Sequence, residues 1–367
     1  MKVLLACGGT GGHLFPGMAL AEAFEEKVPG IEIVFVGTPR GLEKEVIPKT
    51  KWRLEMIESS SLADKKGLGK ITAGIGLLKA LGQSRRLIRK EYPDLVVGVG
   101  GYAAGPVLMM ASLMHKPTLT IEPNAVAGMS NRLLKPFVDR VVVAYPKLAK
   151  TFGDKKTRVL GVPVRKSILK EAAKIAPEPN KKTIFIFGGS QGAKTINEEI
   201  LNALPLLKNM KEQIHFIHQI GKKTSVEVVE KAYREFGFSA EVYPFIDKMG
   251  PFYGRADLVI SRAGANALAE IVALAKPSLL IPYPFSAAGH QEKNASYLDK
   301  MRGAKMLLDK DVTGKTMAEL IRAFVSIPDV LEEMKKKLQK LKGNEAAEKI
   351  VEECLELVRW YDGTMVR

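Results

Sequence analysis

Short apolar runs alternate along the chain with longer segments in which apolar residues recur at helical spacing. In the first half of the chain, the runs that predict strands are residues 3–7, 31–36, 54–57, 95–99, 118–121 and 141–144. Segments of helical period lie between them, at residues 42–47, 71–90 and 103–114. Because strands that alternate with helices form parallel sheets covered on both faces, this pattern predicts an α/β domain.

The same pattern starts again after a polar, proline-broken stretch at residues 176–182. An apolar run at residues 183–187 leads into a glycine-rich turn and then a helix that reaches about Leu204. Further strands are expected at residues 214–218, 242–245, 258–260, 278–281 and 305–308, and a last helix at about 344–361. The sequence therefore predicts two Rossmann-like halves with a cleft between them, and ligands outside the carboxyl ends of the strands.

The composition fits two globular domains and leaves the partner open. The 367 residues carry 56 Lys and Arg against 40 Asp and Glu, a net charge of +16. Such a charge suits nucleic acid, an anionic membrane surface or an anionic small substrate. Two cysteines, Cys7 and Cys354, indicate a reducing compartment and no disulfide framework. No apolar stretch reaches about 18 residues and no leader pattern precedes the first strand, so we expect neither a membrane-spanning helix nor a signal peptide.

The first glycine-rich turn, Gly-Gly-Thr-Gly-Gly at residues 8–12, joins the first strand to the first helix. A buried strand, a glycine turn and a helix start form an anion-binding corner, because backbone N–H groups and the helix dipole converge there. Thr10 and His13 add a hydroxyl and an imidazole to this corner. The turn departs from G-x-G-x-x-G, since His13 and Leu14 follow Gly12, and this disfavours a nicotinamide dehydrogenase.

The second glycine-rich turn, Gly-Gly-Ser-Gln-Gly at residues 188–192, repeats this arrangement after the restart. It resembles a Walker A loop, but Ala193 stands where that motif needs its last glycine, and no magnesium-binding aspartate is identifiable. We therefore expect a bound pyrophosphate rather than nucleoside triphosphate hydrolysis. The backbone N–H groups of residues 189–191 and the Ser190 hydroxyl would hold it.

Polar side chains also follow other predicted strands. Glu270 suits two ribose hydroxyls, and it equally suits a solvated helix face. Gln291 opens a helix after a proline-rich loop, where it could bond a sugar or water. Glu122 and Asn124 project from a Glu-Pro-Asn turn, which turn chemistry alone also explains.

Two aspartates, Asp309 and Asp311, spell the Asp-x-Asp pattern of metal-dependent sugar transferases. We interpret this pattern as a coincidence. No Cys/His cluster has zinc spacing, and the five histidines are scattered along the chain. We therefore predict no metal site and no cofactor.

A basic and apolar segment covers residues 65–90. Its apolar residues recur at helical spacing, with cations among them, which is typical of a helix that lies on an anionic bilayer surface. An amphipathic helix that covers the sheet has the same pattern, and part of the segment must do that. The residues expected at a membrane contact are Ile71, Ile75, Leu78, Lys79, Arg85 and Arg86.

Taken together, these motifs resemble the MurG family, the bacterial N-acetylglucosaminyltransferases of peptidoglycan synthesis, which have the two-domain GT-B fold. The likeness covers almost the whole chain. It is carried by the two glycine-rich turns and by residues 122–124, 163–165, 245–247, 261–264, 270, 290–291 and 294–295. Each segment alone is common, and their order and spacing together are specific. One departure is Val162, which stands where the family usually has asparagine.

The resemblance implies inverting transfer of N-acetylglucosamine from UDP-N-acetylglucosamine to the C4 hydroxyl of the muramoyl sugar of lipid I, which forms lipid II. It also implies a part in cell-wall growth, cell shape and division. Residues 1–162 with 344–367 would bind the acceptor and the membrane, with the last helix packed back on this domain, and residues 163–343 would bind UDP-N-acetylglucosamine. The enzyme would work peripherally at the cytoplasmic face of the cell membrane, with no nucleic acid partner.

Two alternatives remain open. One is a GT-B UDP-sugar transferase that acts on another lipid or on a soluble acceptor. The other is a basic, non-enzymatic binding protein, whose nucleic-acid affinity would depend on salt. The paired glycine-rich turns argue against the second alternative.

By position, the resemblance also implies roles for individual residues. The residues near the donor sugar and the phosphates would be Thr10, Gly11, Gly12, Asn124, Arg165 and Ser190. The residues around the nucleotide would be Ile246, with its backbone at uracil, then Ala265, Asn266, Ala267, Leu268, Ala269, Glu270 at the ribose, and Gln291. His13 would face the acceptor.

An inverting transfer needs a base for the acceptor proton and positive potential for the departing UDP. His13, with an ordinary imidazole pKa of about 6.5, is the leading candidate for the base. Glu122 is the second candidate. Helix starts at the second glycine-rich turn, together with Arg165, would supply the positive potential.

Overall fold

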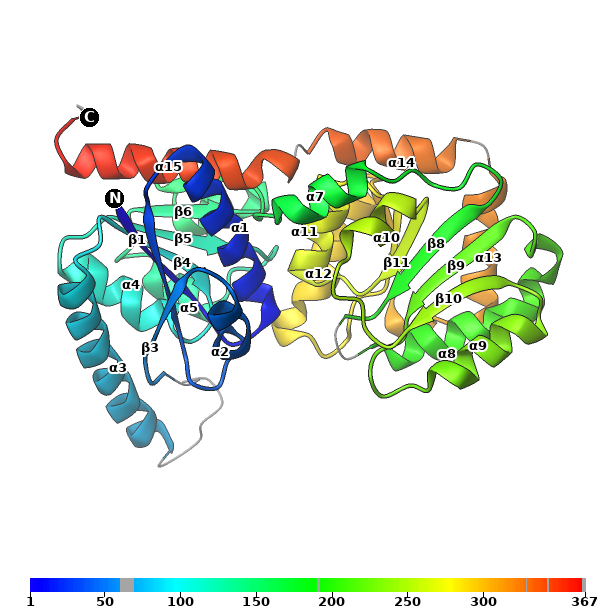
Figure 1. The fold of residues 1–367 in the computed structure, drawn as a ribbon, viewed down its shortest axis with the longest axis horizontal. Coiled ribbons are helices and arrows are strands. Elements are labelled where there is room, and N and C mark those ends of the chain that lie inside the picture. Colours follow the sequence, from blue (N-terminus) through cyan, green and yellow to red (C-terminus); the bar gives the residue numbers. More distant parts are fainter. Residues whose placement is uncertain (60–68, 190–191, 328, 342, 365–367) are drawn as a thin grey trace. The chain divides into compact units, whose positions relative to one another are not determined.

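The computed structural model describes residues 1–59, 69–189, 192–327, 329–341 and 343–364, and the side chains of residues 69–73 and 75 lie outside this description. The chain divides into two compact units. The first unit is Met1–Arg165 with Glu345–Arg367, and the second unit is Lys166–Asn344. Each unit is built on one parallel sheet (Figure 1). This arrangement confirms the predicted pair of Rossmann-like domains.

The sheet of the first unit has the order β3-β2-β1-β4-β5-β6-β7 in the described part of the chain. Its strands are β1 (Lys2–Cys7), β2 (Glu32–Gly37), β3 (Arg53–Met56), β4 (Leu95–Gly100), β5 (Thr118–Glu122), β6 (Arg140–Val143) and β7 (Thr157–Val159). The central strands are apolar almost throughout because helices cover both of their faces. The short edge strand β7 has no apolar run that could have predicted it.

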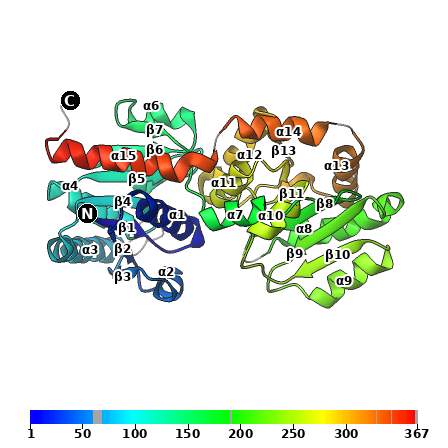
Figure 2. The ribbon, with the colours of Figure 1, turned by 45° about the horizontal axis from the view of Figure 1, so that its top comes forward.

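Helices pack on both faces of this sheet (Figure 2). The helices are α1 (Gly11–Lys27), α2 (Glu43–Val46), α3 (Gly69–Glu91), α4 (Ala104–Leu113), α5 (Met129–Leu134), α6 (Ala149–Phe152) and α15 (Ala346–Tyr361), with 3-10 turns η1 (Ile47–Lys49) and η2 (Pro146–Leu148). One core contains α1 and α15, so the end of the chain packs on the first unit. The other core contains residues of α3, α4 and α5.

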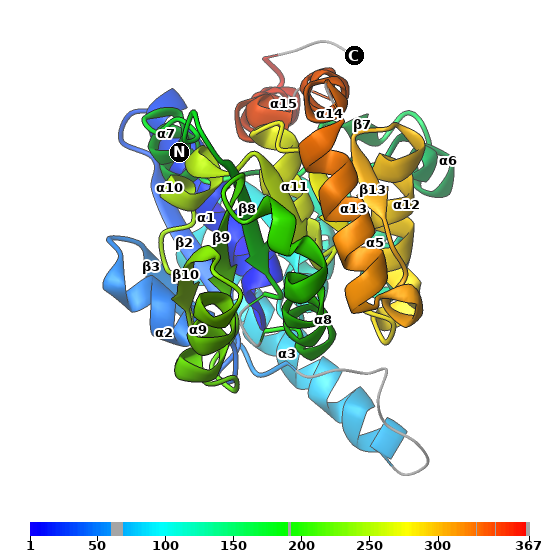
Figure 3. The same cartoon turned by 90° about the vertical axis from the view of Figure 1, so that its right-hand side faces the viewer.

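The sheet of the second unit has the order β10-β9-β8-β11-β12-β13 in the described residues (Figure 3). Its strands are β8 (Lys182–Phe187), β9 (Ile214–Gln219), β10 (Ser239–Tyr243), β11 (Leu258–Ser261), β12 (Ser278–Leu280) and β13 (Ala304–Met306). Its helices are α7 (Lys166–Ala173), α8 (Lys194–Ala203), α9 (Val226–Glu235), α10 (Gly250–Arg255), α11 (Ala265–Ala273), α12 (His290–Lys300), α13 (Gly314–Ser326) and α14 (Val330–Gln339). The 3-10 turns are η3 (Leu204–Met210), η4 (Ala287–Gly289), η5 (Asp309–Asp311) and η6 (Gly343–Glu345), the last across the unit boundary.

The first strand of each unit lies where the strand order changes direction. Strand β1 pairs with β2 and β4, and β8 pairs with β9 and β11. Such a switch point leaves room outside the carboxyl ends of the strands, and both glycine-rich turns lie there. Within the described residues, no helix is both long enough and apolar enough to cross a bilayer.

Candidate active site

The second glycine-rich turn follows β8 and needs its glycines for steric reasons. A Cβ atom at Gly188 would lie 2.2 Å from the Ala193 nitrogen, and one at Gly192 would lie 2.3 Å from the Ile220 carbonyl oxygen. Gly192 also has a φ of +75°, which side chains rarely adopt. The turn leads into α8, whose first N–H groups have no partner inside the helix. The predicted Ser190 contact lies outside the described residues.

A cavity of about 520 Å³ lies over this turn, within the size range of small-molecule sites. Its lining combines the backbone of the turn and of the α8 start with side chains from three later loops. These include Gly188, Gly189, Lys194, Arg262, Tyr283 and Gln291. Two cationic side chains and a helix start therefore border one cavity at the carboxyl edge of the second sheet, which suits a phosphorylated ligand.

Arg262 is held in this cavity by several groups. Its guanidinium forms an ion pair with Asp309 and donates to the carbonyl oxygen of Ile281 at 3.3 Å. Thr195 Oγ1 donates to Asp309 Oδ2 at 3.4 Å. Asp309, the first aspartate of the Asp-x-Asp pattern, thus serves as the partner of an arginine. Among the described residues, no cluster of three His, Cys, Asp or Glu side chains could hold a metal ion.

Gln291, at the start of α12, joins two loops of the cavity. Its Oε1 accepts hydrogen bonds from the backbone N–H groups of Ala263, at 3.1 Å, and Tyr283, at 2.9 Å. The carbonyl end of the side chain is therefore engaged, and the Nε2 group is the end that can meet a ligand.

Helix α11 carries six of the predicted nucleotide-binding residues. Leu268 is buried in the core, so only its backbone can contact a ligand. Ala265, Asn266, Ala267 and Ala269 are partly exposed. Glu270 accepts a hydrogen bond of 2.9 Å from the hydroxyl of Tyr253. Burial and the Glu270 carboxylate raise the pKa of Tyr253 well above its ordinary value, so this hydroxyl stays a donor and orients Glu270.

Gln219, a buried residue at the end of β9, was not predicted from the sequence. Its Nε2 donates to the carbonyl oxygen of Gly189 at 3.1 Å, and its Oε1 accepts from the Ile246 N–H at 3.1 Å. The side chain thus ties the second glycine-rich turn to Ile246. Because the Ile246 N–H is engaged by Gln219, the backbone carbonyl oxygen of Ile246 is the group that can bind a nucleobase.

A carboxylate of the chain itself holds one end of the first glycine-rich turn. Glu43, fully buried on α2, accepts hydrogen bonds from the N–H groups of Gly9, at 2.9 Å, and Thr38, at 2.7 Å. The sequence pattern of residues 42–47 predicts a short helix but gives no sign that this glutamate reaches the turn. A buried carboxylate therefore fixes the Gly9 end of this turn.

His13 lies in the first turn of α1, next to the glycine pair Gly100 and Gly101 at the end of β4. Its Nδ1 is 3.2 Å from the Val99 carbonyl oxygen. A Cβ at Gly100 would lie 2.4 Å from this Nδ1, and one at Gly101 would lie 1.8 Å from the Gly8 carbonyl oxygen. Burial lowers the pKa of His13, while the Val99 carbonyl and the carboxylates of Glu122 and Glu43 act in the opposite direction. The imidazole is therefore neutral at pH 7.

Glu122 is buried and engaged by its own loop. It accepts hydrogen bonds from the Gly128 N–H at 2.7 Å, from Asn131 Nδ2 at 2.9 Å and from the Asn124 N–H at 3.1 Å. Asn131, which sequence reasoning missed, also donates to the Ile121 carbonyl oxygen. The carboxylate therefore shapes the loop that carries Asn124.

The remaining predicted site residues that the structure places in the first unit lie around the start of α1; they include Arg165, which was predicted in the second domain. Thr10 is the N-cap residue, and Gly11 and Gly12 form the first turn. The centre of the Arg165 guanidinium lies 4.5 Å from the ring centroid of Phe15, a residue of α1. Its Nε is buried and has no hydrogen-bond partner among the described residues. The structure thus gathers these residues at the carboxyl edge of the first sheet.

The predicted membrane segment falls on α3. Leu78 is 70% exposed, and Arg85 and Arg86 are exposed as well. Lys79 is exposed and forms an ion pair with Glu58 at 2.6 Å. The side chains of Ile71 and Ile75 lie outside the described residues.

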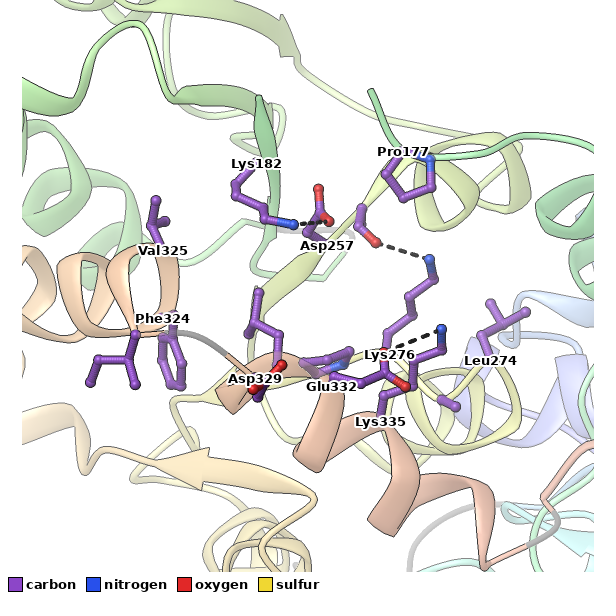
Figure 4. Close-up of a pocket in the computed structure, with 15 residues that line it drawn as sticks. Pro177, Lys182, Asp257, Leu274, Lys276, Phe324, Val325, Asp329, Glu332 and Lys335 are labelled. Atoms are coloured by element: carbon purple, nitrogen blue, oxygen red, sulfur yellow. Dashed lines mark hydrogen bonds and ion pairs between the residues drawn. The ribbon is translucent and has the colours of Figure 1, made fainter. Parts of the chain in front are cut away.

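A second cavity, of about 440 Å³, lies at the opposite edge of the second sheet (Figure 4). Lys182 and Asp257, which form an ion pair of 3.2 Å, line it together with Lys276. Lys276 donates to the Ala256 carbonyl oxygen at 2.9 Å, and burial lowers its pKa to about 8. None of the residues predicted from the sequence lines this cavity, so it is separate from the cavity over the second glycine-rich turn.

Known proteins resemble this chain over nearly its full length. Residues 3–143 match the glycosyltransferase family 28 N-terminal domain, and residues 183–350 match the family 28 C-terminal domain. A UDP-N-acetylglucosamine–N-acetylmuramyl-(pentapeptide) pyrophosphoryl-undecaprenol N-acetylglucosamine transferase of Anaeromyxobacter sp. strain Fw109-5 is 42% identical, over 98% of this chain and 94% of its own. The transferase of the same name from Thermodesulfovibrio yellowstonii is also 42% identical, over 98% of this chain and 99% of its own.

The chain belongs to the MurG family. The crystal structure of Acinetobacter baumannii MurG agrees with this assignment, with a TM-score of 0.79, 28% identity, and coverage of 97% of this chain and 99% of that one. The chain is accordingly a glycosyltransferase with the GT-B fold. The resemblance predicted from the sequence is confirmed, and a non-enzymatic binding protein is not favoured.

Proposed function

We propose that this chain transfers N-acetylglucosamine from UDP-N-acetylglucosamine to the muramoyl sugar of lipid I, and so forms lipid II in peptidoglycan synthesis. Membership of the MurG family supports this reaction. The structural observation that carries the donor assignment is the cavity over the second glycine-rich turn, which Lys194, Arg262 and the α8 start border. A diphosphate is the part of the donor that such a cavity suits.

The donor side of the reaction belongs to the second unit. The diphosphate lies against the second glycine-rich turn and Arg262, and Ser190 adds its hydroxyl. Glu270, oriented by Tyr253, accepts hydrogen bonds from the ribose, and the Ile246 carbonyl meets the uracil N–H. The α11 segment and Gln291 close around the nucleotide sugar. Charge develops on the diphosphate as the glycosidic bond breaks, and fixed N–H groups and guanidinium groups stabilise it there.

The acceptor side belongs to the first unit, with His13 as the base. When Nδ1–H of His13 donates to the Val99 carbonyl, Nε2 carries the lone pair. A neutral imidazole with this tautomer can take the proton of the acceptor C4 hydroxyl as that oxygen attacks the anomeric carbon. Inversion follows from attack on the face opposite the leaving UDP.

Glu122 is the alternative base, and its geometry favours a supporting role. Its carboxylate already accepts three backbone and side-chain hydrogen bonds from its own loop. These bonds engage both carboxylate oxygens with groups of the protein itself. We infer that Glu122 fixes Asn124 near the donor sugar, while Thr10, Gly11, Gly12 and Arg165 line the same side of the reaction.

Helix α3 is the proposed contact with the membrane that holds the lipid acceptor, at its cytoplasmic face. Exposed Leu78 would enter the interface, and Arg85 and Arg86 would meet anionic headgroups. Replacing Leu78 with Asp should lower flotation with vesicles that contain anionic phospholipid, while UDP binding is retained. The matched control is Val228→Asp, because Val228 is 63% exposed on α9 of the second unit. Equal vesicle binding by both variants would place the contact elsewhere.

The decisive experiment measures transfer of labelled N-acetylglucosamine from its UDP donor to a short-chain lipid I analogue, with and without EDTA. A parallel reaction offers a soluble muramoyl acceptor that lacks the lipid. Transfer to the analogue in both conditions supports the proposal. Transfer lost in EDTA would give Asp309 and Asp311 a metal role. Preference for the soluble acceptor would favour the alternative of a transferase with another substrate.

A further inference from the structure

Glu43 occupies a cradle that three glycines open for it. A Cβ at Gly8 would lie 2.5 Å from Glu43 Oε1, one at Gly37 would lie 2.3 Å from its Cγ, and one at Gly41 would lie 2.1 Å from its Oε2. Side chains at these positions would collide with the carboxylate or its stem. The turn after β1, the last residue of β2 and the loop before α2 therefore leave room for one buried side chain, which is fully shielded from solvent.

The hydrogen bonds of Glu43 match those of a bound anion. Oε1 accepts from the Thr38 N–H at 2.7 Å and from Thr38 Oγ1 at 3.2 Å, and Oε2 accepts from the Gly9 N–H at 2.9 Å. Such bonds to an ionised carboxylate are stronger than bonds between neutral groups. They compensate for burial of the charge.

The same contact holds the first glycine-rich turn from both sides. Gly9 donates its N–H to Glu43, and its carbonyl oxygen accepts a 3.2 Å hydrogen bond from the Leu42 N–H. Gly9 stands next to Thr10, the N-cap residue of α1, and His13 follows within the first turn of that helix. The position of the imidazole is thus tied to α2.

We infer that Glu43 is a positioning residue for the transfer reaction: it binds the Gly9 N–H of the first glycine-rich turn as an anion would, and so fixes the backbone that carries Thr10 and His13. This inference rests on the proposed function for the role of His13. The part that concerns Glu43 itself rests on its cradle and its hydrogen bonds.

The charge of Glu43 should also act on His13. The charged and polar groups that face the imidazole are Glu43 from α2, Glu122 from the end of β5 and the Val99 carbonyl from β4. All three raise the pKa of His13 against the effect of burial. Loss of the Glu43 charge should therefore lower the pKa of His13, and the acid limb of the rate profile should move to lower pH.

The test replaces Glu43 with Gln, which keeps its size and removes its charge. The control is Glu45→Gln, on the exposed face of the same helix. We expect kcat for the lipid I analogue to fall roughly 10- to 100-fold in Glu43→Gln, because the base is misplaced. The KM for UDP-N-acetylglucosamine should change much less than kcat, since we propose that its UDP part binds the second unit. The control should match the unchanged chain.

An NMR titration of the His13 ring separates this role from a merely structural one. The pKa of His13 should fall in Glu43→Gln and stay unchanged in Glu45→Gln. An unchanged kcat together with an unchanged pKa would overturn the inference. A lower kcat with an unchanged His13 pKa and a lower melting temperature would reduce Glu43 to a structural residue and also overturn it.

A second variant keeps the inference testable if Glu43→Gln folds poorly. Glu43→Ala leaves a cradle of N–H donors that formate or acetate can fill. Recovery of kcat with added formate, but not with chloride at the same ionic strength, supports an anion requirement, and no recovery in a folded variant contradicts it. If His13→Ala retains full turnover, the base assignment fails, and formate rescue still decides the role of Glu43 separately.

Discussion

The two glycine-rich turns of this chain share one plan and differ in what completes them. Each follows the first strand of its sheet, lies at a switch point and leads into a helix. Glu43 binds the Gly9 N–H of the first turn, while a cavity with Arg262 and Lys194 at its border opens over the second. The local motif alone therefore does not tell which groups complete a turn. In the first unit, a residue 34 positions away from Gly9 does so.

The largest expected effect tests the first turn. Replacing His13 with Ala should lower turnover by roughly 10²- to 10⁴-fold, because the acceptor proton loses its base. The affinity for UDP should change far less, since we propose that UDP binds the second unit. Steady-state transfer assays and calorimetric titration with UDP measure the two quantities. Unimpaired turnover would remove His13 from the mechanism.

The pH profile sharpens the same prediction. In the proposed mechanism the active form of His13 is the neutral imidazole, and burial lowers its pKa. Activity should therefore hold at neutral pH and be lost as the pH falls through a value below the ordinary 6.5 or so. An acid limb above pH 7 would be inconsistent with the environment of His13.

The next effect tests the second turn. Replacing Arg262 with Ala should weaken UDP binding roughly 10- to 100-fold, because a hydrogen bond to a charged group contributes about 1.5 to 3 kcal/mol. Arg234→Ala, at an exposed site on α9, is the control. The double variant Arg262→Ala/Asp309→Asn removes the carboxylate left without its partner. Full recovery in the double variant would mean that Asp309 repels the diphosphate and that Arg262 does not bind it.

The smallest effect concerns Glu270. Replacing Tyr253 with Phe removes one hydrogen bond that orients this carboxylate, so UDP should bind about 3- to 10-fold more weakly, in line with roughly 1 kcal/mol. Tyr233→Phe is the matched control, because that buried hydroxyl lies 3.1 Å from His218 and away from the cavity. Equal losses in both variants would point to general destabilisation.

The sequence could predict whatever depends on neighbouring residues. Apolar runs and glycine turns identified both sheets and both corners, because strand, turn and helix are encoded within about 25 residues each. The paired Gly100 and Gly101 carried a readable signal too, since two glycines after an apolar run indicate a close backbone approach. That signal was missed.

What the sequence could not predict depends on contacts between distant segments. Glu43 looks like any carboxylate on a short helix until Gly8, Gly37 and Gly41 are brought around it. In the sequence, Gln219 is only the last residue of an apolar strand. Its hydrogen bonds to Gly189 and Ile246 are visible only in the folded chain. Periodicity indicates which face of an element is buried. It carries no information on which polar group from a distant segment contacts that face.

The cradle of Glu43 also sets a rule for building hybrid enzymes. Its carboxylate and its three glycines all lie between residues 8 and 43, within the first unit. An exchange of the whole second unit, to alter which nucleotide sugar is used, therefore leaves these contacts intact. A graft of the first glycine-rich turn alone would instead carry Gly9 into the recipient without the carboxylate that binds its N–H group.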